Sequence, residues 1–151
     1  MRRQAVAWRV SMLFGSVLLV SQPLSGQDKG VVGYWKEPGG SVIHVDRCGT
    51  DVCATLVAIS STAPSRVDGK NPKRELEGRS LCGLRIGEGF HLVSPVRADG
   101  GSLYDPKSGK TYHGVMTSDG DALDLRGYVG ISIFGRTERW TRIAAVNACT
   151  S

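Results

Sequence analysis

The chain has 151 residues, with 19 basic and 14 acidic side chains and a net charge of +5. Three of the basic residues and none of the acidic ones lie in 1–26, so the remaining 125 residues carry 16 basic and 14 acidic groups, a net charge of +2. A segment this close to neutrality lacks the concentrated positive charge that nucleic-acid binding requires, and its length suits one domain with a single core.

The first 26 residues have the order of a secretory signal peptide. Arg2 and Arg3 precede an uncharged, mostly apolar run over 10–20, which is followed by small residues up to Gly26. The run is about half of the ~20 residues that a membrane-spanning helix needs, so we expect cleavage after Gly26 and export, not a membrane anchor. Position 27 is glutamine and not cysteine, so no lipid anchor is predicted. The predicted organisation is a signal peptide over 1–26 and one domain over 27–151.

The rest of the chain alternates short apolar segments with turn sequences rich in glycine, proline and aspartate. This pattern predicts an all-β domain, an antiparallel meander closed into a barrel, because closure leaves no exposed strand edge. Asp99-Gly100-Gly101 is one of the predicted turns. The predicted strands are 31–36, 41–47, 53–59, 84–86, 90–96, 102–104, 110–118, 122–129 and 135–143.

Four cysteines lie beyond residue 26, and an even number in an exported chain favours disulfide bonds. Cys48 and Cys53 flank a glycine-containing turn, so we expect a bond across a hairpin. The sequence permits a bond between Cys82 and Cys149 without indicating it. The Cys-x4-Cys spacing differs from the Cys-x-x-Cys of zinc and redox sites, so we predict neither a metal site nor a cofactor.

The segment 60–80 interrupts the meander. It is polar, and it contains Pro64, Asp68-Gly69 and Asn71-Pro72 before a charged run. A segment of this length is too long for a hairpin loop, and the charged run predicts a short helix over about 74–78 that covers one end of the barrel. The alternative is a plain surface excursion.

Short motifs are spread over nearly all of 27–151. They are Gly33-Tyr34-Trp35, Cys48-Gly49, Cys53, Lys70-Asn71-Pro72, 79–84, Tyr104-Asp105-Pro106, 108–112, 126–130 and 135–142. In this order they resemble the bacterial exported family called domain of unknown function 2147. The resemblance implies a fold and a location outside the cytoplasm, but no activity.

A looser resemblance connects the two ends of the domain to lipocalins and other calycins. Gly33 and Trp35 form a Gly-x-Trp motif on the first predicted strand, and the last strand carries Trp140 and Arg142. In the calycin pattern the tryptophan closes the barrel floor beneath an arginine of the last strand, a contact of about 0.5 to 2 kcal/mol. The resemblance therefore implies barrel closure by these residues, with Arg142 or Arg139 as the partner of Trp35.

Polar and aromatic residues near the predicted barrel mouth are the candidates for ligand contact. They are Asn71, Tyr112, Arg126, Tyr128 and Arg136. Arginines can pair with a carboxylate or phosphate head group while aromatic rings cover an apolar tail. Leu123 and Leu125 occupy the opposite face of the strand that carries Arg126. If the leucines fill the interior, Arg126 points outward unless a bulge at Gly127 changes the register.

We expect an exported protein that binds a small amphiphilic or apolar molecule, with an acidic amphiphile or lipid-like molecule as the first candidate. Two alternatives stay open. One is an extracytoplasmic enzyme that uses Asp105, Tyr112, Arg126 and Arg136 at the barrel mouth, although no catalytic motif is present. The other is a protein-interaction module that uses the outer wall. A pocket with an apolar lining favours the binding protein, and a cluster of buried ionisable groups favours the enzyme.

Overall fold

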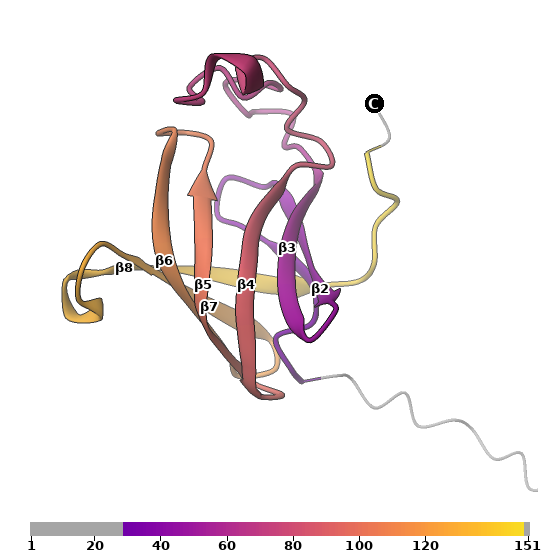
Figure 1. Cartoon of the computed structure of the whole chain (residues 1–151). Coiled ribbons are helices and arrows are strands. Elements are labelled where there is room, and N and C mark those ends of the chain that lie inside the picture. Colours follow the sequence, from indigo (N-terminus) through magenta and orange to yellow (C-terminus); the bar gives the residue numbers. More distant parts are fainter. Residues whose placement is uncertain (1–28, 150–151) are drawn as a thin grey trace, which may run out of the picture.

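The computed structural model describes residues 29–149, so the predicted signal peptide over 1–26 lies outside the described residues. Eight antiparallel strands follow the order of the chain, and the first pairs with the last to close a barrel (Figure 1). The strands are β1 (Gly33–Lys36), β2 (Val42–Cys48), β3 (Asp51–Ala58), β4 (Arg85–Ser94), β5 (Arg97–Asp105), β6 (Lys110–Ser118), β7 (Ala122–Tyr128) and β8 (Arg136–Ile143). Two 3-10 helices, η1 (Arg74–Leu76) and η2 (Ser132–Phe134), lie in the loops. Within 29–149, no helix has the length and apolar character needed to cross a membrane.

The predicted all-β barrel is confirmed, but one predicted turn is wrong. Asp99, Gly100 and Gly101 lie inside β5, and the turn occupies 95–96 instead. Gly100 has a φ of 73°, and the pairing of β5 with β6 shifts between Asp99 and Gly101. The glycine pair therefore forms a bulge and does not reverse the chain. The segments predicted separately over 84–86 and 90–96 mostly belong to one strand, β4. This strand continues without a turn through Gly87 and Gly89.

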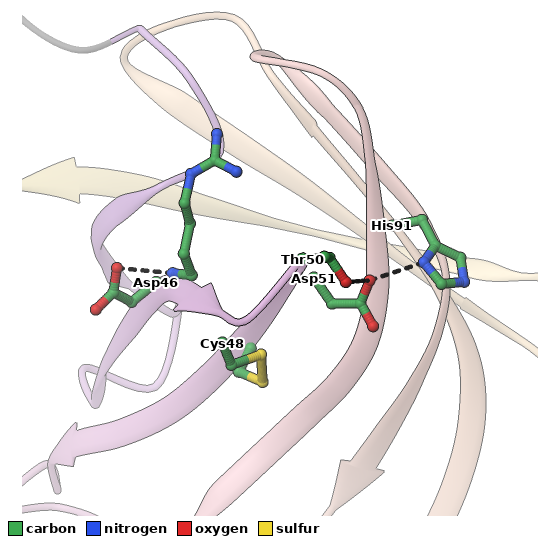
Figure 2. The surroundings of a disulfide bond; sticks show 7 residues. Asp46, Cys48, Thr50, Asp51 and His91 are labelled. Carbon is green, nitrogen blue, oxygen red and sulfur yellow. Dashed lines mark hydrogen bonds and ion pairs between the residues drawn. A yellow bond between two sulfur atoms is a disulfide. The ribbon is translucent and has the colours of Figure 1, made fainter.

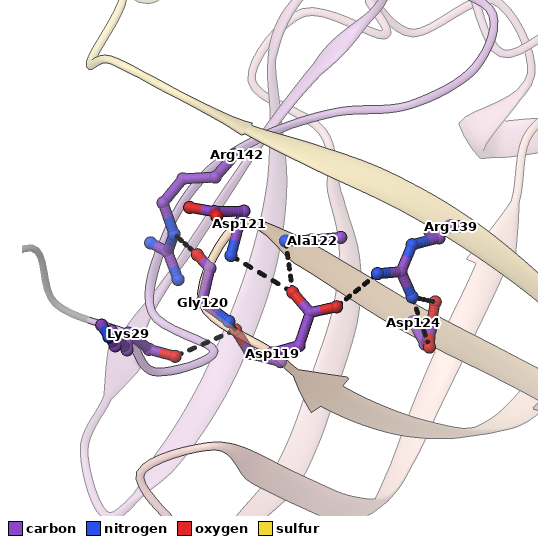
Figure 3. A network of polar contacts seen from close by, with 9 residues as sticks. Lys29, Asp119, Gly120, Asp121, Ala122, Asp124, Arg139 and Arg142 are labelled. Atoms are coloured by element: carbon purple, nitrogen blue, oxygen red, sulfur yellow. Dashed lines mark hydrogen bonds and ion pairs between the residues drawn. The ribbon is translucent and has the colours of Figure 1, made fainter.

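Arg142 joins the two ends of the barrel where β1 meets β8. It is the direct register partner of Trp35, and its guanidinium lies over the indole, 4.0 Å from the ring centroid. It also donates hydrogen bonds to the carbonyl oxygens of Gly30, Val32 and Gly120. Figure 3 shows the contact with Gly120 in the turn between β6 and β7. One side chain therefore connects the N-terminal segment, the last strand and this turn.

Gly33 and Trp35 are shaped to receive this arginine. Trp35 is fully buried, and its Nε1 donates a hydrogen bond of 2.8 Å to the carbonyl oxygen of Val31. Gly33 has a φ of 141°, and a Cβ there would lie 2.5 Å from Nη1 of Arg142. Only glycine leaves room for the guanidinium in this conformation. The Gly-x-Trp motif and the arginine of the last strand are one packing unit.

Arg139, the other candidate partner of Trp35, faces outward on β8. Its Nη1 donates to both carboxylate oxygens of Asp124, at 2.9 and 3.0 Å, and its Nη2 donates to Asp119 (Figure 3). Hydrogen bonds from the backbone N–H of Ala122 and from Arg139 lower the pKa of Asp119. This exposed network links the β6–β7 turn to β8, but it does not contribute to closing the interior.

Phe90 fills the interior near the closed end because glycines surround it. Its ring is fully buried, and a Cβ at Gly101 or Gly114, on β5 and β6, would overlap with ring carbons. Gly87 leaves space on the other side, next to Ala54. The other large buried side chains of the core include Ile43, Val45, Val52, Met116 and Leu123.

Two disulfide bonds are present. The predicted bond between Cys48 and Cys53 is confirmed, and it joins β2 and β3 across their hairpin with a Cα–Cα distance of 5.8 Å (Figure 2). Cys82 and Cys149 are also bonded, with a Cα–Cα distance of 5.7 Å. Because it closes a loop of 67 residues, the second bond stabilises the fold more on the chain-entropy estimate, by about 4 kcal/mol against about 2. It holds the C-terminal segment against the barrel.

We expect Arg142→Lys to lower the free energy of unfolding by about 2 to 4 kcal/mol, because an ammonium group cannot satisfy three carbonyl oxygens and stack on the indole at once. Arg139→Lys is the matched control on the same strand, and it should have a much smaller effect because its partners are exposed. Urea unfolding followed by tryptophan fluorescence measures both. Equal losses in the two variants would contradict the closing role of Arg142.

We expect Gly101→Ala to destabilise the protein by about 1 to 3 kcal/mol, because the added methyl group forces Phe90 out of its position. Gly69→Ala is the control, since nothing lies within 4 Å of a Cβ there. Thermal unfolding by circular dichroism compares the two. A Gly101→Ala protein as stable as Gly69→Ala would show that the ring has room to move.

Candidate ligand-binding cavity

A cavity of about 990 Å³ occupies the end of the barrel away from Arg142. Its position follows from β8, where Arg136, Glu138 and Trp140 line the cavity and Arg142 is the next residue on the same face. The walls are mainly apolar. They include Ile43, Leu56, Ile86, Leu103, Leu125 and Trp140.

The period-two alternation of side chains along β8 explains how polar groups reach this cavity. Trp140 is buried on the cavity floor, and its Nε1 donates a 2.6 Å hydrogen bond to Oε2 of Glu138. Arg136, two residues before Glu138 on the same strand, is exposed and lines the opening of the cavity. The strand therefore passes from a cation at the rim to an aromatic ring at the floor.

A buried carboxylate and a lysine meet at the rim. Glu37 accepts hydrogen bonds from the backbone N–H groups of Gly39 and Ser41, at 2.6 and 3.0 Å, and its Oε2 lies 3.4 Å from Nζ of Lys107. Burial raises the pKa of Glu37, but these donors and the charge of Lys107 outweigh it, so the pKa lies below its ordinary value. Glu37 is thus a charged group with partners, and it connects the β1–β2 turn to the β5–β6 turn.

The segment 60–80 forms part of the cavity wall. Figure 1 shows this segment above the ends of β5 and β6. Its backbone rests on the β5–β6 turn at Gly109, where a Cβ would overlap with the carbonyl group of Lys70. The helix in this segment is shorter than the one predicted over 74–78, a single 3-10 turn at Arg74–Leu76. Residues 63–65, 67, 69 and 70 line the cavity.

Asp68 holds this segment to β5. Its carboxylate is fully buried, and it accepts hydrogen bonds from Tyr104 Oη at 2.6 Å, Asn71 Nδ2 at 2.8 Å and Arg79 Nε at 3.0 Å. Burial raises the pKa of Asp68, but the three donors outweigh it and lower the pKa below its ordinary value. Burial and the hydrogen bond to Asp68 raise the pKa of Tyr104 to about 12. The arrangement is a latch between the segment and the barrel.

The structure brings three of the five candidate ligand residues to the cavity. Tyr112, Tyr128 and Arg136 line it, with the ring of Tyr128 close to His113 at a centroid distance of 5.6 Å. Asn71 belongs to the latch and borders a smaller cleft of about 450 Å³ outside the barrel. Asn71 is therefore not a wall residue of the main cavity.

Arg126 lies outside the cavity. Leu123 and Leu125 are buried in the core, so the alternation of β7 turns Arg126 to the outer face. Its guanidinium donates to the carbonyl oxygens of Ser132 and Ile133, at 2.8 and 3.1 Å, and to Thr137 Oγ1 at 3.0 Å. Arg126 holds the β7–β8 loop.

Three of the four residues considered for an enzyme line the cavity, but none of the three is buried. Asp105 lines the cavity, but its carboxylate accepts hydrogen bonds from Lys107 N and Ser108 Oγ within its own turn, at 2.9 and 2.6 Å. Arg126 is on the outer face. Within residues 29–149, no group of three or more histidine, cysteine, aspartate or glutamate side chains could hold a metal ion.

Three polar residues shape the mouth without a sequence pattern that predicts this role, namely Glu37, Lys107 and Asp68. Glu37 and Lys107 lie 70 residues apart and carry no motif. Asp68 precedes a glycine, which is typical of a turn, and its burial depends on donors from Tyr104 and Arg79. Only the fold brings these groups together.

Comparison with known proteins agrees with this architecture. Residues 33–142 match the family described as "Uncharacterized protein conserved in bacteria (DUF2147)". Among solved structures, the chain is similar to protein HP1028 from the human pathogen Helicobacter pylori, which belongs to the lipocalin family. The two share 20% identity with a TM-score of 0.68, over 75% of this chain and 82% of that chain. No curated protein matches the chain. At this identity the structural likeness shows the fold alone.

We expect the latch to fail at both extremes of pH. The lowered pKa of Asp68 means that its contribution is present above its ordinary pKa of 3.8 and is lost as the pH falls through its folded value. The raised pKa of Tyr104 means that its contribution is complete below about pH 10 and is lost between 10 and about 12. Thermal stability measured against pH should show both losses, and Tyr104→Phe should remove the alkaline one. An alkaline loss of the same size in that variant would assign it to another group.

Proposed function

The chain belongs to the bacterial family DUF2147, and we propose that it binds a small amphiphile with an acidic head group in the cavity at its barrel mouth. One observation carries the proposal. Arg136 lines an apolar cavity, and within residues 29–149 its guanidinium has no ion pair or hydrogen bond. The unpaired guanidinium at the rim can bind an acidic head group, and the apolar walls below it can bind an apolar tail.

The size and lining of the cavity support a small ligand. Its volume of about 990 Å³ lies at the upper end of the ~300 to 1,000 Å³ typical of ligand pockets. The lipocalin-like barrel also supports a small-molecule site, since barrels of about eight strands can either fill themselves or hold one ligand. Here Phe90 and its glycine neighbours fill the closed end, and the other end stays open.

The charges at the rim favour an acidic head group. Each acidic side chain that lines the cavity already accepts hydrogen bonds from the protein, and these side chains are Glu37, Asp105 and Glu138. Arg136 remains to pair with an anion, and the Tyr112 hydroxyl can donate a further hydrogen bond. An acidic head group at Arg136 would leave its tail over Leu125 and Trp140.

The proposal places the protein outside the cytoplasm. Two disulfide bonds within 29–149 support this location, because disulfides persist in oxidising compartments. The signal sequence predicted over 1–26 supports it independently.

Dodecanoate and dodecanol are suitable probes because they differ in charge and share a tail. Titration by calorimetry, with Trp140 fluorescence as a second signal, should detect binding of dodecanoate to the native protein. Arg136→Met should weaken dodecanoate about tenfold or more and leave dodecanol unchanged, because only the charged hydrogen bond is lost.

Arg47→Met is the matched control. Arg47 is exposed, and it lies at the end of β2 opposite to Ile43, which lines the cavity. It should bind both probes as the native protein does. Equal binding of dodecanoate by Arg136→Met and Arg47→Met would remove Arg136 from the site. Failure of the native protein to bind either probe would contradict an amphiphile site.

A further inference from the structure

The β7–β8 loop, residues 129–135, exposes four large apolar side chains. Val129 is 72% exposed, Ile131 59%, Ile133 71% and Phe134 78%. Elsewhere within residues 29–149, the exposed large hydrophobic residues are three valines. Figure 1 shows the loop projecting sideways from the barrel. Apolar side chains gathered on one projecting loop mark a contact surface, because scattered single residues are the normal condition of a protein surface.

The conformation of this loop is fixed from its base. Arg126 donates to the carbonyl oxygens of Ser132 and Ile133, and the N–H of Gly135 donates to Ser132 O at 3.0 Å. These bonds draw the backbone carbonyl groups of η2 toward β7 and leave the side chains of Ile133 and Phe134 exposed. The apolar surface is therefore presented by a defined turn.

We propose that the β7–β8 loop inserts into the interface of an anionic lipid bilayer. Charge complementarity identifies this partner. The stretch 126–137 contains Arg126 and Arg136 and no acidic residue. An apolar tip with basic residues and an aromatic ring, here Tyr128, at its base matches the chemistry of a bilayer interface, where tails meet phosphate head groups.

The cations of the cavity rim extend this surface. Lys70 and Arg136 line the same opening as Val129 and Phe134, whereas Lys107 is paired with Glu37. Each basic residue near an anionic membrane surface strengthens the attraction to it. A bilayer that received the loop would also lie next to the mouth of the cavity.

A second copy of the chain fits the loop less well. Four side chains with these exposures present on the order of 500 Å², whereas each partner in a stable complex buries ~800 Å². The surface is also a narrow projection bordered by like charges, which would repel one another across a symmetric contact. A bilayer requires neither a flat area nor a complementary shape.

The inference does not depend on the proposed ligand, because the loop would bind a membrane whether or not the cavity is occupied. Its test uses protein purified after expression of the full chain, with the N-terminus identified by intact mass, and sedimentation with vesicles. One set of vesicles contains phosphatidylcholine alone, and the other contains phosphatidylcholine with phosphatidylglycerol. The native protein should sediment with the anionic vesicles, and less so as salt is raised.

The double variant Ile131→Ser and Ile133→Ser, at two exposed residues that do not line the cavity, should bind the anionic vesicles about tenfold or more weakly, because two inserted apolar side chains are lost. Val93→Ser is the matched control, since Val93 is 61% exposed on β4, and it should bind as the native protein does. Phe134→Trp provides a direct probe. Its fluorescence should be quenched by brominated lipids, while the buried Trp35 and Trp140 should not be.

Three results would overturn the inference. One is native protein that does not sediment with anionic vesicles, and another is equal binding by the double variant and Val93→Ser. The third is a native dimer that the double variant dissociates, with vesicle binding unchanged, which would assign the loop to contact between copies. Dodecanoate titration of the double variant separates the two proposals. A variant that loses vesicle binding and still binds dodecanoate would show that the loop binds the membrane independently of the cavity.

Discussion

The contact of Arg142 with Trp35 is the constraint on which the rest of the barrel depends. A meander of eight strands has two free edges, and they meet where these two residues pair across β1 and β8. The guanidinium stacks on the indole and also satisfies carbonyl oxygens of the N-terminal segment and of the β6–β7 turn. Because Gly33 must leave space for it, the first and last strands of the chain are specified together. Because Arg142 closes this end of the barrel, the cavity opens at the opposite end.

The interior divides into a filled part and an open part through side-chain size. Gly101 and Gly114 allow Phe90 to lie across two strands and fill the closed end. Nearer the mouth the walls carry mainly medium-sized apolar side chains, and a cavity remains between them. The latch at Asp68 then places the segment 60–80 over that opening, and the buried carboxylate that holds it is not part of the cavity wall. The lining below the segment therefore stays largely apolar.

Local patterns were sufficient for the barrel and for part of the site. The turn between Cys48 and Cys53 predicted their bond, and alternation predicted that Arg126 points outward if Leu123 and Leu125 fill the interior. The pattern was misleading at Gly100, because a glycine pair forms a turn or a bulge depending on a partner strand that the sequence does not specify. The bond between Cys82 and Cys149, and the burial of Asp68, depend on contacts between distant segments. Such contacts leave no periodic signal in one sequence.

Arg126 and Arg136 illustrate how alternation assigns different roles to similar residues. Both lie near the mouth, on neighbouring strands, and Gly127 pairs with Arg136. Because β7 places Leu125 inside, Arg126 is directed outward and holds the β7–β8 loop, whereas Arg136 lines the cavity. The loop between them is apolar and exposed. If it lies in a bilayer, Arg136 is next to the lipid phosphates, and an acidic amphiphile can pass from the bilayer to this arginine without exposing its tail to water. The two proposals then describe consecutive contacts of one molecule with one face of the barrel.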